Sequence, residues 1–360
     1  MRLLFKPPCR GRILASICAR ALRGLCFWLS ILWCACSGAR QVAPQENLLA
    51  SQQVKKWLQE ALTAVVGVSA VYNYQLTSFR HQFAHGKLQP DASSPTGFRL
   101  LPPPQGAIAE RELDIQRVNG GGLIIYRDLQ YAVILTSAHV FNKPDTIYHY
   151  DRADTSVSRR LLLGRAVQKS RNFYVINQSN QYLIAEVLHQ DQRTDLALLQ
   201  VPVSAALGTN FPFGLAAPEE IEWGDFVYVI GYPREVKQLS TGVVSRVPFP
   251  GAFILDTVAR FGFSGGPVFI VRPESGLELA GVVRGVPANK LRYVAPPKDL
   301  PAAQVLNDQD LKGLASQEID LIDYGTTYAV GTDFIKKFLH EADEVLKRRG
   351  IELDERYVKD

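Results

Sequence analysis

Two series of short apolar segments, separated by turn residues, limit the fold of this chain more than any other feature. The first series runs from Gly120 to Val201 and the second from Phe226 to Val330, with a connection at residues 202–221 that contains three prolines. Many short strands at such intervals are typical of a β-barrel or a β-sandwich. The sequence therefore predicts an all-β protein built from two successive β units.

A serine between glycines stands within the second series, in the segment Gly262-Phe263-Ser264-Gly265-Gly266-Pro267. A serine hydroxyl becomes an effective nucleophile when a base removes its proton and backbone N–H groups stabilise the negative charge that forms on the substrate. Glycines let the backbone bend tightly beside such a serine. A glycine-rich turn with an incidental serine is common, so this segment alone predicts little.

The first series contains a histidine that could act as the base and an aspartate that could orient it. His139 follows an apolar segment of strand type, and Asp195 opens another. Either residue alone is usually structural, but His, Asp, Ser is one of the known chain orders of the acyl-transfer triad. We therefore predict His139, Asp195 and Ser264 as catalytic residues. Asp191 is a rival for the acid, although its polar surroundings at residues 189–193 suit a solvated loop better.

The three segments resemble the catalytic motifs of the trypsin-like (chymotrypsin-fold) serine peptidases, and those of the HtrA/Deg-type branch most closely. Further segments resemble strands and loops of that branch, namely Gly120–Ile125, Val227–Pro233, Ser240–Ser245 and Tyr328–Val330. The resemblance covers about residues 64 to 349. It implies two six-stranded antiparallel β-barrels, at residues 64–203 and 204–331, with the active site in the cleft between them.

The resemblance also implies the mechanism of a serine endopeptidase that acts on polypeptide substrates through an acyl-enzyme. His139 takes the proton of Ser264 and returns it to the leaving amine, while Asp195 fixes the histidine tautomer. The backbone N–H groups of Gly262 and Ser264 form the oxyanion hole, and neither a metal nor an organic cofactor is required. Val258, six residues before the nucleophile, lies at the base of the substrate pocket, which implies cleavage after small or medium aliphatic residues.

Phe263 departs from the family pattern. Trypsins have Asp at this position, which receives the new N-terminal ammonium after zymogen cleavage, and HtrA proteins usually have Asn. Two interpretations are open, because the ring either packs beneath the loop or holds the oxyanion N–H groups in an inactive pose. The second interpretation leaves an alternative function, that of a catalytically weak or inactive binding or chaperone-like protein of the cell envelope.

The helical spacing of apolar residues predicts a helix on each side of the β units. The first lies within residues 40–63, and the second runs from Thr332 to Arg349 within a C-terminal segment at 332–360. HtrA proteins usually carry a PDZ domain after the protease. The ten residues that follow Gly350 leave no room for one, so we expect a chain without it.

A long polar insertion at residues 78–117 interrupts the first β unit. An insertion of this length is either a functional flap or a surface segment. Its His81 and His85 have the spacing of a metal pair on a helix, but no carboxylate or cysteine partner is apparent. We therefore expect both histidines to be exposed rather than to bind a metal.

Residues 1–39 have the pattern of a secretory signal peptide. They contain six Lys or Arg and no acid, followed by an apolar run from Leu25 to Ala35 and then by small residues. The apolar run is too short for a comfortable membrane span. A mitochondrial presequence is the alternative that the basic start leaves open. We expect an exported protein, periplasmic or secreted.

The leader also holds all five cysteines, which are Cys9, Cys18, Cys26, Cys34 and Cys36. The rest of the chain therefore has no internal disulfide and relies on its core. Cys36 loosely resembles a bacterial lipoprotein cleavage site, which leaves a lipid-anchored form open. Without the leader, 34 Lys and Arg face 35 Asp and Glu, so the net charge of +5 implies no nucleic-acid partner. The sequence predicts no oligomeric state.

Overall fold

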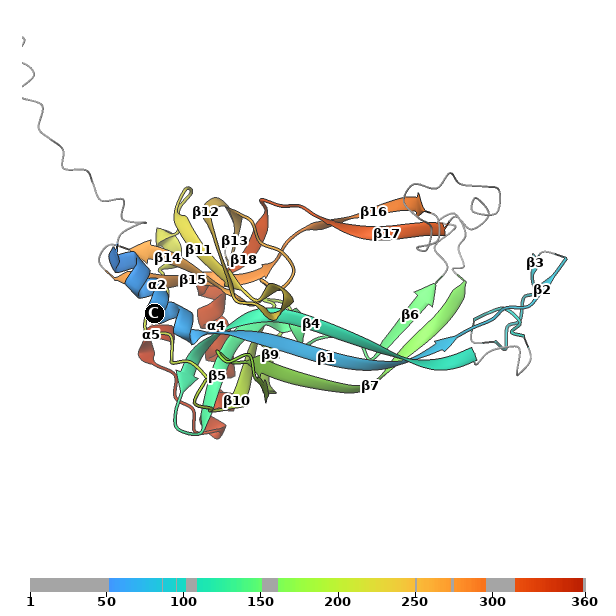
Figure 1. Ribbon diagram of the computed structural model, residues 1–360, viewed down its shortest axis with the longest axis horizontal. Coiled ribbons are helices and arrows are strands. Elements are labelled where there is room, and N and C mark those ends of the chain that lie inside the picture. Colours follow the sequence, from blue (N-terminus) through green and yellow to red (C-terminus); the bar gives the residue numbers. More distant parts are fainter. Residues whose placement is uncertain are drawn as a thin grey trace, which may run out of the picture. The chain divides into compact units, whose positions relative to one another are not determined.

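The computed structural model describes residues 52–85, 87–94, 96–101, 109–150, 161–249, 251–272, 275–295 and 315–358. The predicted signal peptide, Cys36 and the first part of the predicted N-terminal helix lie outside these residues. Strands make up most of the described structure (Figure 1), which confirms the all-β prediction.

The first β unit is an eight-stranded antiparallel sheet. Its strands pair in the order β6-β7-β1-β4-β5-β10-β9, and β8 pairs with β7. The bounds are Val65–Ser78 for β1, Ala109–Arg127 for β4, Tyr131–Ser137 for β5, Thr146–Tyr150 for β6, Leu162–Ile176 for β7, Tyr182–Ile184 for β8, Glu186–Asp191 for β9 and Leu196–Pro202 for β10. The inward side chains of β1, β4, β5 and β10 are fully buried and form the core of this unit.

This sheet is curled like half of a barrel, in keeping with a two-barrel fold, but it has eight strands where six were expected. In the part of the chain that the structure describes, its end strands β6 and β9 do not pair with each other. Part of the predicted insertion is strand rather than loop, because β1 and β4 stay paired out to Ser78 and Ala109. A small hairpin of β2 (Phe83–Ala84) and β3 (Lys87–Leu88) follows at the far end of β1 (Figure 1).

The second β unit is a closed six-stranded barrel, as expected, with the strand order β11-β12-β13-β18-β15-β14. Its bounds are Phe226–Gly231 for β11, Gln238–Phe249 for β12, Ala252–Thr257 for β13, Pro267–Arg272 for β14, Gly276–Gly285 for β15 and Thr327–Gly331 for β18. Buried apolar side chains from these strands, together with Phe263, fill its interior. Between β15 and β18 the chain forms a separate two-stranded ribbon of β16 (Ala288–Ala295) and β17 (Ala315–Ile322).

Helices flank the two β units as predicted. Helix α2 (Gln52–Ala64) leads directly into β1 and buries Val54, Leu58 and Ala61. Helix α4 (Thr332–Arg348) follows β18 and buries one face, which consists of Thr332, Ile335, Phe338, Leu339, Ala342 and Leu346. It agrees with the predicted C-terminal helix to within one residue. A short helix, α5 (Glu355–Val358), follows it.

Candidate active site

A cavity of about 1160 Å³ contains all three residues of the predicted triad in its walls. His139 and Asp195 come from the first β unit, and Ser264 comes from the second. His139 lies in a single 3-10 turn, Ala138–Val140, directly after β5. Ser264 lies in the loop between β13 and β14. The fold therefore brings together residues that are 125 positions apart in the sequence, from His139 to Ser264.

Asp195 holds His139 through two hydrogen bonds. The Nδ1 atom of the His139 ring lies 2.8 Å from Oδ2 of Asp195, and the backbone N–H of His139 donates to Oδ1 at 2.8 Å. The Asp195 side chain is 9% exposed and that of His139 is 44% exposed. A buried carboxylate that fixes Nδ1 leaves Nε2 as the ring nitrogen available for proton transfer, which is the arrangement that a general base requires.

Further contacts position the turn that carries His139. The backbone N–H of Ala138 donates to the carbonyl of Asp195 at 3.0 Å, and the hydroxyl of the buried Tyr72 donates to the carbonyl of Val140 at 3.1 Å. The Ser137 hydroxyl donates to the carbonyl of Val283 on β15 at 3.0 Å, which ties the first unit to the second beside the site. Sequence reasoning identifies neither Tyr72 nor Ser137 as a site residue, because their roles depend on contacts between distant segments.

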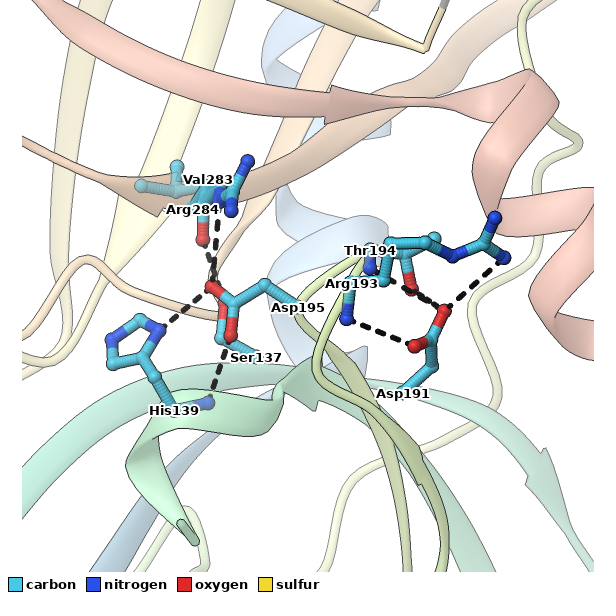
Figure 2. A network of polar contacts seen from close by, with 8 residues as sticks. All are labelled: Ser137, His139, Asp191, Arg193, Thr194, Asp195, Val283 and Arg284. Carbon is cyan, nitrogen blue, oxygen red and sulfur yellow. Dashed lines mark hydrogen bonds and ion pairs between the residues drawn. The ribbon is translucent and has the colours of Figure 1, made fainter. Parts of the chain in front are cut away.

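The turn before β10 orients Asp195 and gives its rival a different role. Asp195 has a φ of +62°, a left-handed conformation that Asp tolerates better than most residues. The Asp191 carboxylate instead accepts hydrogen bonds within the turn, from Arg193 N at 2.9 Å and from the Thr194 hydroxyl at 2.9 Å (Figure 2). Burial opposes its ionisation, yet these hydrogen bonds hold the pKa of Asp191 below its usual range. Asp191 therefore caps the turn, and Asp195 contacts the histidine.

The loop that carries Ser264 is held by backbone hydrogen bonds on both sides. The carbonyl of Ser264 accepts from Gly121 N at 2.8 Å, and Gly265 N donates to the carbonyl of Val283 at 2.8 Å. Gly265 has a φ of +77°, and a Cβ there would lie 2.1 Å from Oγ1 of Thr136. Only glycine fits this position, because both the backbone conformation and the space exclude a side chain.

The two predicted oxyanion donors are available in this loop. In the described parts of the chain, the backbone N–H groups of Gly262 and Ser264 donate to no other backbone atom. The neighbouring N–H of Phe263, in contrast, donates to the carbonyl of Arg260 at 3.0 Å. Two such free N–H groups beside a serine hydroxyl are what an oxyanion hole requires.

Phe263 packs into the interior of the second barrel. Its side chain is 2% exposed and belongs to the same apolar cluster as Val229, Val268 and Leu255. The ring therefore packs beneath the loop that carries Ser264. An apolar side chain in this place cannot form the ion pair that trypsins make there.

Two features of the site differ from the arrangement expected from the sequence. No hydrogen bond joins the Ser264 hydroxyl to the His139 ring among the described residues. Val258 is not among the residues that line the cavity of the triad, and the residue is 66% exposed. Its neighbours Thr257 and Ala259 are buried, and the N–H of Ala259 donates to the carbonyl of Thr257 at 3.1 Å, so Val258 is the central residue of a tight turn. The structure thus gives no support to Val258 as the base of the substrate pocket.

Arg284 is a charged neighbour of the triad that sequence reasoning missed. Its Nε atom lies 4.0 Å from Oδ2 of Asp195, the same oxygen that meets the His139 ring (Figure 2). Arg284 follows Val283 near the end of β15, in a segment without any recognisable motif. No signal in the sequence indicates that the end of this strand reaches the turn of Asp195.

The described residues contain no group of three or more His, Cys, Asp or Glu side chains arranged to hold a metal ion. His81 is buried rather than exposed, with 8% of its surface accessible, and burial lowers the pKa of its imidazole. No helix within the described ranges is both long and apolar enough to cross a membrane.

Comparison with known proteins agrees with the three motifs. No curated protein sequence matches the chain. Among solved structures, that of the "HtrA-type protease AlgW with decapeptide" matches with 16% sequence identity and a TM-score of 0.42, over 82% of this chain and 67% of the other. Residues 120–272, which include His139, Asp195 and Ser264, match the model of the trypsin-like peptidase domain. This match confirms the predicted resemblance to the trypsin-like peptidases over residues 120–272.

Proposed function

We propose that the protein is a serine endopeptidase that hydrolyses peptide bonds in polypeptide substrates with His139, Asp195 and Ser264. The observation that carries this proposal is the pair of 2.8 Å hydrogen bonds from His139 to Asp195, in the wall of a cavity that Ser264 shares. A structural histidine needs neither a buried carboxylate on Nδ1 nor a partly exposed ring. A general base needs both.

In the proposed reaction, Nε2 of His139 takes the proton of the Ser264 hydroxyl as its oxygen attacks the peptide carbonyl. The carbonyl oxygen becomes an oxyanion, which the N–H groups of Gly262 and Ser264 receive. Removing one such donor typically costs about 3–4 kcal/mol of transition-state stabilisation. His139 then gives the proton to the leaving amine, and an acyl-enzyme remains. Water then attacks the acyl-enzyme by the same steps and releases the carboxylic acid product, while Asp195 stabilises the imidazolium at each step.

The second candidate function is a binding or chaperone-like protein that uses the same cavity without turnover. The missing hydrogen bond between Ser264 and His139 favours it. In many proteases without substrate this contact is long and tightens only when substrate binds, so the same observation is compatible with catalysis. The buried hydrogen bonds of Asp195 favour the peptidase, because a binding cavity has no need of them.

Labelling with a serine-directed fluorophosphonate tests the proposal most directly. Wild-type protein should be labelled on Ser264 and should cleave casein, whereas Ser264→Ala should do neither and should keep its circular dichroism spectrum and melting temperature. Ser245→Ala serves as a matched control, because Ser245 lies in the same barrel as Ser264 but outside the cavity, and its hydroxyl donates to the carbonyl of Ile254 at 3.2 Å. An unlabelled, inactive wild type would favour the binding protein. Equal cleavage by Ser264→Ala would reveal a contaminating protease.

A further inference from the structure

The walls of the triad cavity carry a strong excess of positive charge. Among the described residues, five lining residues are Lys or Arg, namely Arg117, Lys143, Arg234, Arg260 and Arg284, and one is an acid, Asp195. That acid already accepts two hydrogen bonds from His139. The excess is local, because the chain without its leader has nearly equal numbers of basic and acidic residues. A local excess in a cavity indicates a ligand of opposite charge.

Two of these arginines have no acidic partner. Arg117 pairs with Glu235 at 3.1 Å, and Arg284 lies 4.0 Å from Asp195. Within the described ranges, Arg234 forms no ion pair, and Arg260 donates only to the neutral amide oxygen of Gln238. Both side chains are exposed at the cavity. Their guanidinium groups are therefore available to a carboxylate, which they can bind with two parallel hydrogen bonds.

Backbone contacts join the segments of both arginines to the loop that carries the nucleophile. Arg260 lies four residues before Ser264 in the same loop, and its carbonyl accepts the N–H of Phe263. Arg234 follows Pro233, whose Cα would lie 2.5 Å from a Cβ on Gly262. The N–H of Tyr232 also donates to the carbonyl of Gly262 at 2.8 Å. Both arginines are therefore attached to the backbone of the predicted oxyanion loop.

Arg234 is held there in an unfavourable backbone conformation. Arg234 and Glu235 have φ values of +53° and +63°, in the 3-10 turn Pro233–Glu235. The left-handed region is costly for residues other than glycine, because the Cβ atom approaches the following carbonyl oxygen. The contacts of Glu235 with Arg117 and Tyr182 keep the turn in this form. Such strain is concentrated at functional sites, and here it places a basic side chain at the cavity.

We propose that Arg234 and Arg260 recognise an acidic side chain, Asp or Glu, in the polypeptide segment that occupies this cavity. The ligand is taken to be a polypeptide because of the proposed peptidase function, so the inference rests on that proposal. The inference replaces Val258, which does not line the cavity, as the basis for specificity. Arg284 is left out of the recognition pair, because it contacts the carboxylate of Asp195.

Binding to Ser264→Ala tests the inference without turnover. The probes are fluorescent peptides of about eight residues built from Ala and Val, blocked at both ends, in which a single Glu or Gln is moved through every position. At low ionic strength the best Glu peptide should bind roughly tenfold more tightly than its Gln counterpart, the effect of about one well-placed charged hydrogen bond. Raising the salt concentration should reduce this ratio, because exposed charges are screened.

Arginine variants on the Ser264→Ala background identify the recognising groups. Arg234→Gln and Arg260→Gln should each reduce the Glu-to-Gln ratio several-fold, and the double variant should bring it close to one. Lys337→Gln, which removes an exposed charge on α4 away from the cavity, should leave the ratio unchanged. A ratio of one in the parent, or a ratio that survives the double variant, would overturn the inference. So would equal binding of a Gln peptide with a free C-terminal carboxylate, since the anion recognised would then be the chain terminus.

Fluorophosphonate labelling of the wild type separates this inference from the proposed function. Labelling of Ser264 without any preference for Glu means that the protein is a peptidase and that the two arginines do not recognise an acidic residue of the substrate. A Glu preference without labelling means that the cavity selects acidic polypeptides and that the peptidase proposal is wrong.

Discussion

At the scale of single residues, Asp195 and Asp191 offer a direct comparison of two carboxylates four positions apart. In Asp195→Asn the amide NH₂ group faces Nδ1 of His139 and favours the wrong histidine tautomer. We expect kcat to fall by roughly 10⁴, as in other triads of this kind, with little change in stability. Steady-state kinetics on a peptide substrate, together with thermal melting, measures both effects.

Asp191→Asn is the matched control. It weakens the hydrogen bonds from Arg193 N and from the Thr194 hydroxyl, so it should cost about 1 kcal/mol of stability and leave most of kcat. A loss of kcat as large as that of Asp195→Asn would mean that the proposed assignment of the two acids is wrong.

Gly265 gives a second prediction at the residue scale. Gly265→Ala places a Cβ 2.1 Å from Oγ1 of Thr136 in a left-handed conformation, so both strain and overlap destabilise the fold. We expect a loss of roughly 2–5 kcal/mol in the free energy of unfolding, measured by urea denaturation. Gly224 has a φ of +86°, and a Cβ added there would meet no atom within 4 Å, so Gly224→Ala isolates the backbone contribution. Its expected cost is about 1 kcal/mol. Equal losses in the two variants would contradict the role of close packing at Gly265.

At the scale of elements, Lys237 joins helix α2 to the start of β12. Its Nζ donates to the carbonyl of Leu62 and to Oε1 of Gln178, each at 2.8 Å, and lies 5.7 Å from the centre of the Tyr232 ring. Burial lowers the pKa of Lys237 to about 8, from 10.5 in the unfolded chain. Between these two values the unfolded chain binds more protons than the folded one, so the contribution of Lys237 to stability rises with pH.

Lys237→Met removes this dependence. The difference in unfolding free energy between wild type and Lys237→Met should therefore grow in favour of the wild type from about pH 8 to about pH 10, by at most about 1.4 kcal/mol per pH unit. Urea denaturation at several pH values across this range measures it. The exposed Lys337 on α4 provides the control, since Lys337→Met should leave the difference from wild type constant. A difference for Lys237→Met that stays constant over this range would contradict the buried position of the ammonium group.

The elements also show where sequence reasoning is sufficient and where it is not. Strands that are buried on both faces, such as β5 and β10, carry continuous apolar runs. The sequence therefore predicts these strands and also the residues that follow or precede them. The outer parts of β1 and β4 carry polar side chains, and their pattern therefore suggests a loop where the structure has paired strands. The sequence also does not predict the turn that contains Arg234. Its left-handed residues are not glycines, and the contacts that hold them come from Arg117 and Tyr182, far away in the sequence.

At the scale of the whole molecule, we propose that residues 1–39 are removed on export. They lie outside the described residues, and the proposal rests on their basic, acid-free start, the following apolar run and the restriction of all five cysteines to this segment. The protein isolated from its native source should begin at Arg40 or, if it is lipidated, at Cys36. Intact-mass measurement distinguishes the two forms, and retention of Met1 would contradict both.

The packing of Phe263 in the second barrel bears on how the predicted oxyanion loop becomes ordered. In trypsins, a new N-terminal ammonium pairs with the Asp beside the nucleophile, so activity depends on one free N-terminal residue. Here Phe263 takes that place and is buried among apolar side chains of the second barrel, where an ammonium group would remain unpaired. Burying an unpaired charge is strongly unfavourable. The apolar core of the barrel therefore supports the loop in place of an ion pair.

It follows that the exact N-terminus should not matter for peptidase activity. Protein that begins with an added Met before Arg40 should have the same kcat/KM as protein that begins at Arg40, and acetylation of the terminal amine should change neither value. A charged terminus inserted beside Phe263 would have to displace this ring from the core, which the burial of Phe263 opposes. A strict requirement for one free N-terminal residue would show that the loop is ordered in another way. Phe263→Asp should then be tolerated, whereas core packing predicts that it destabilises the barrel by several kcal/mol.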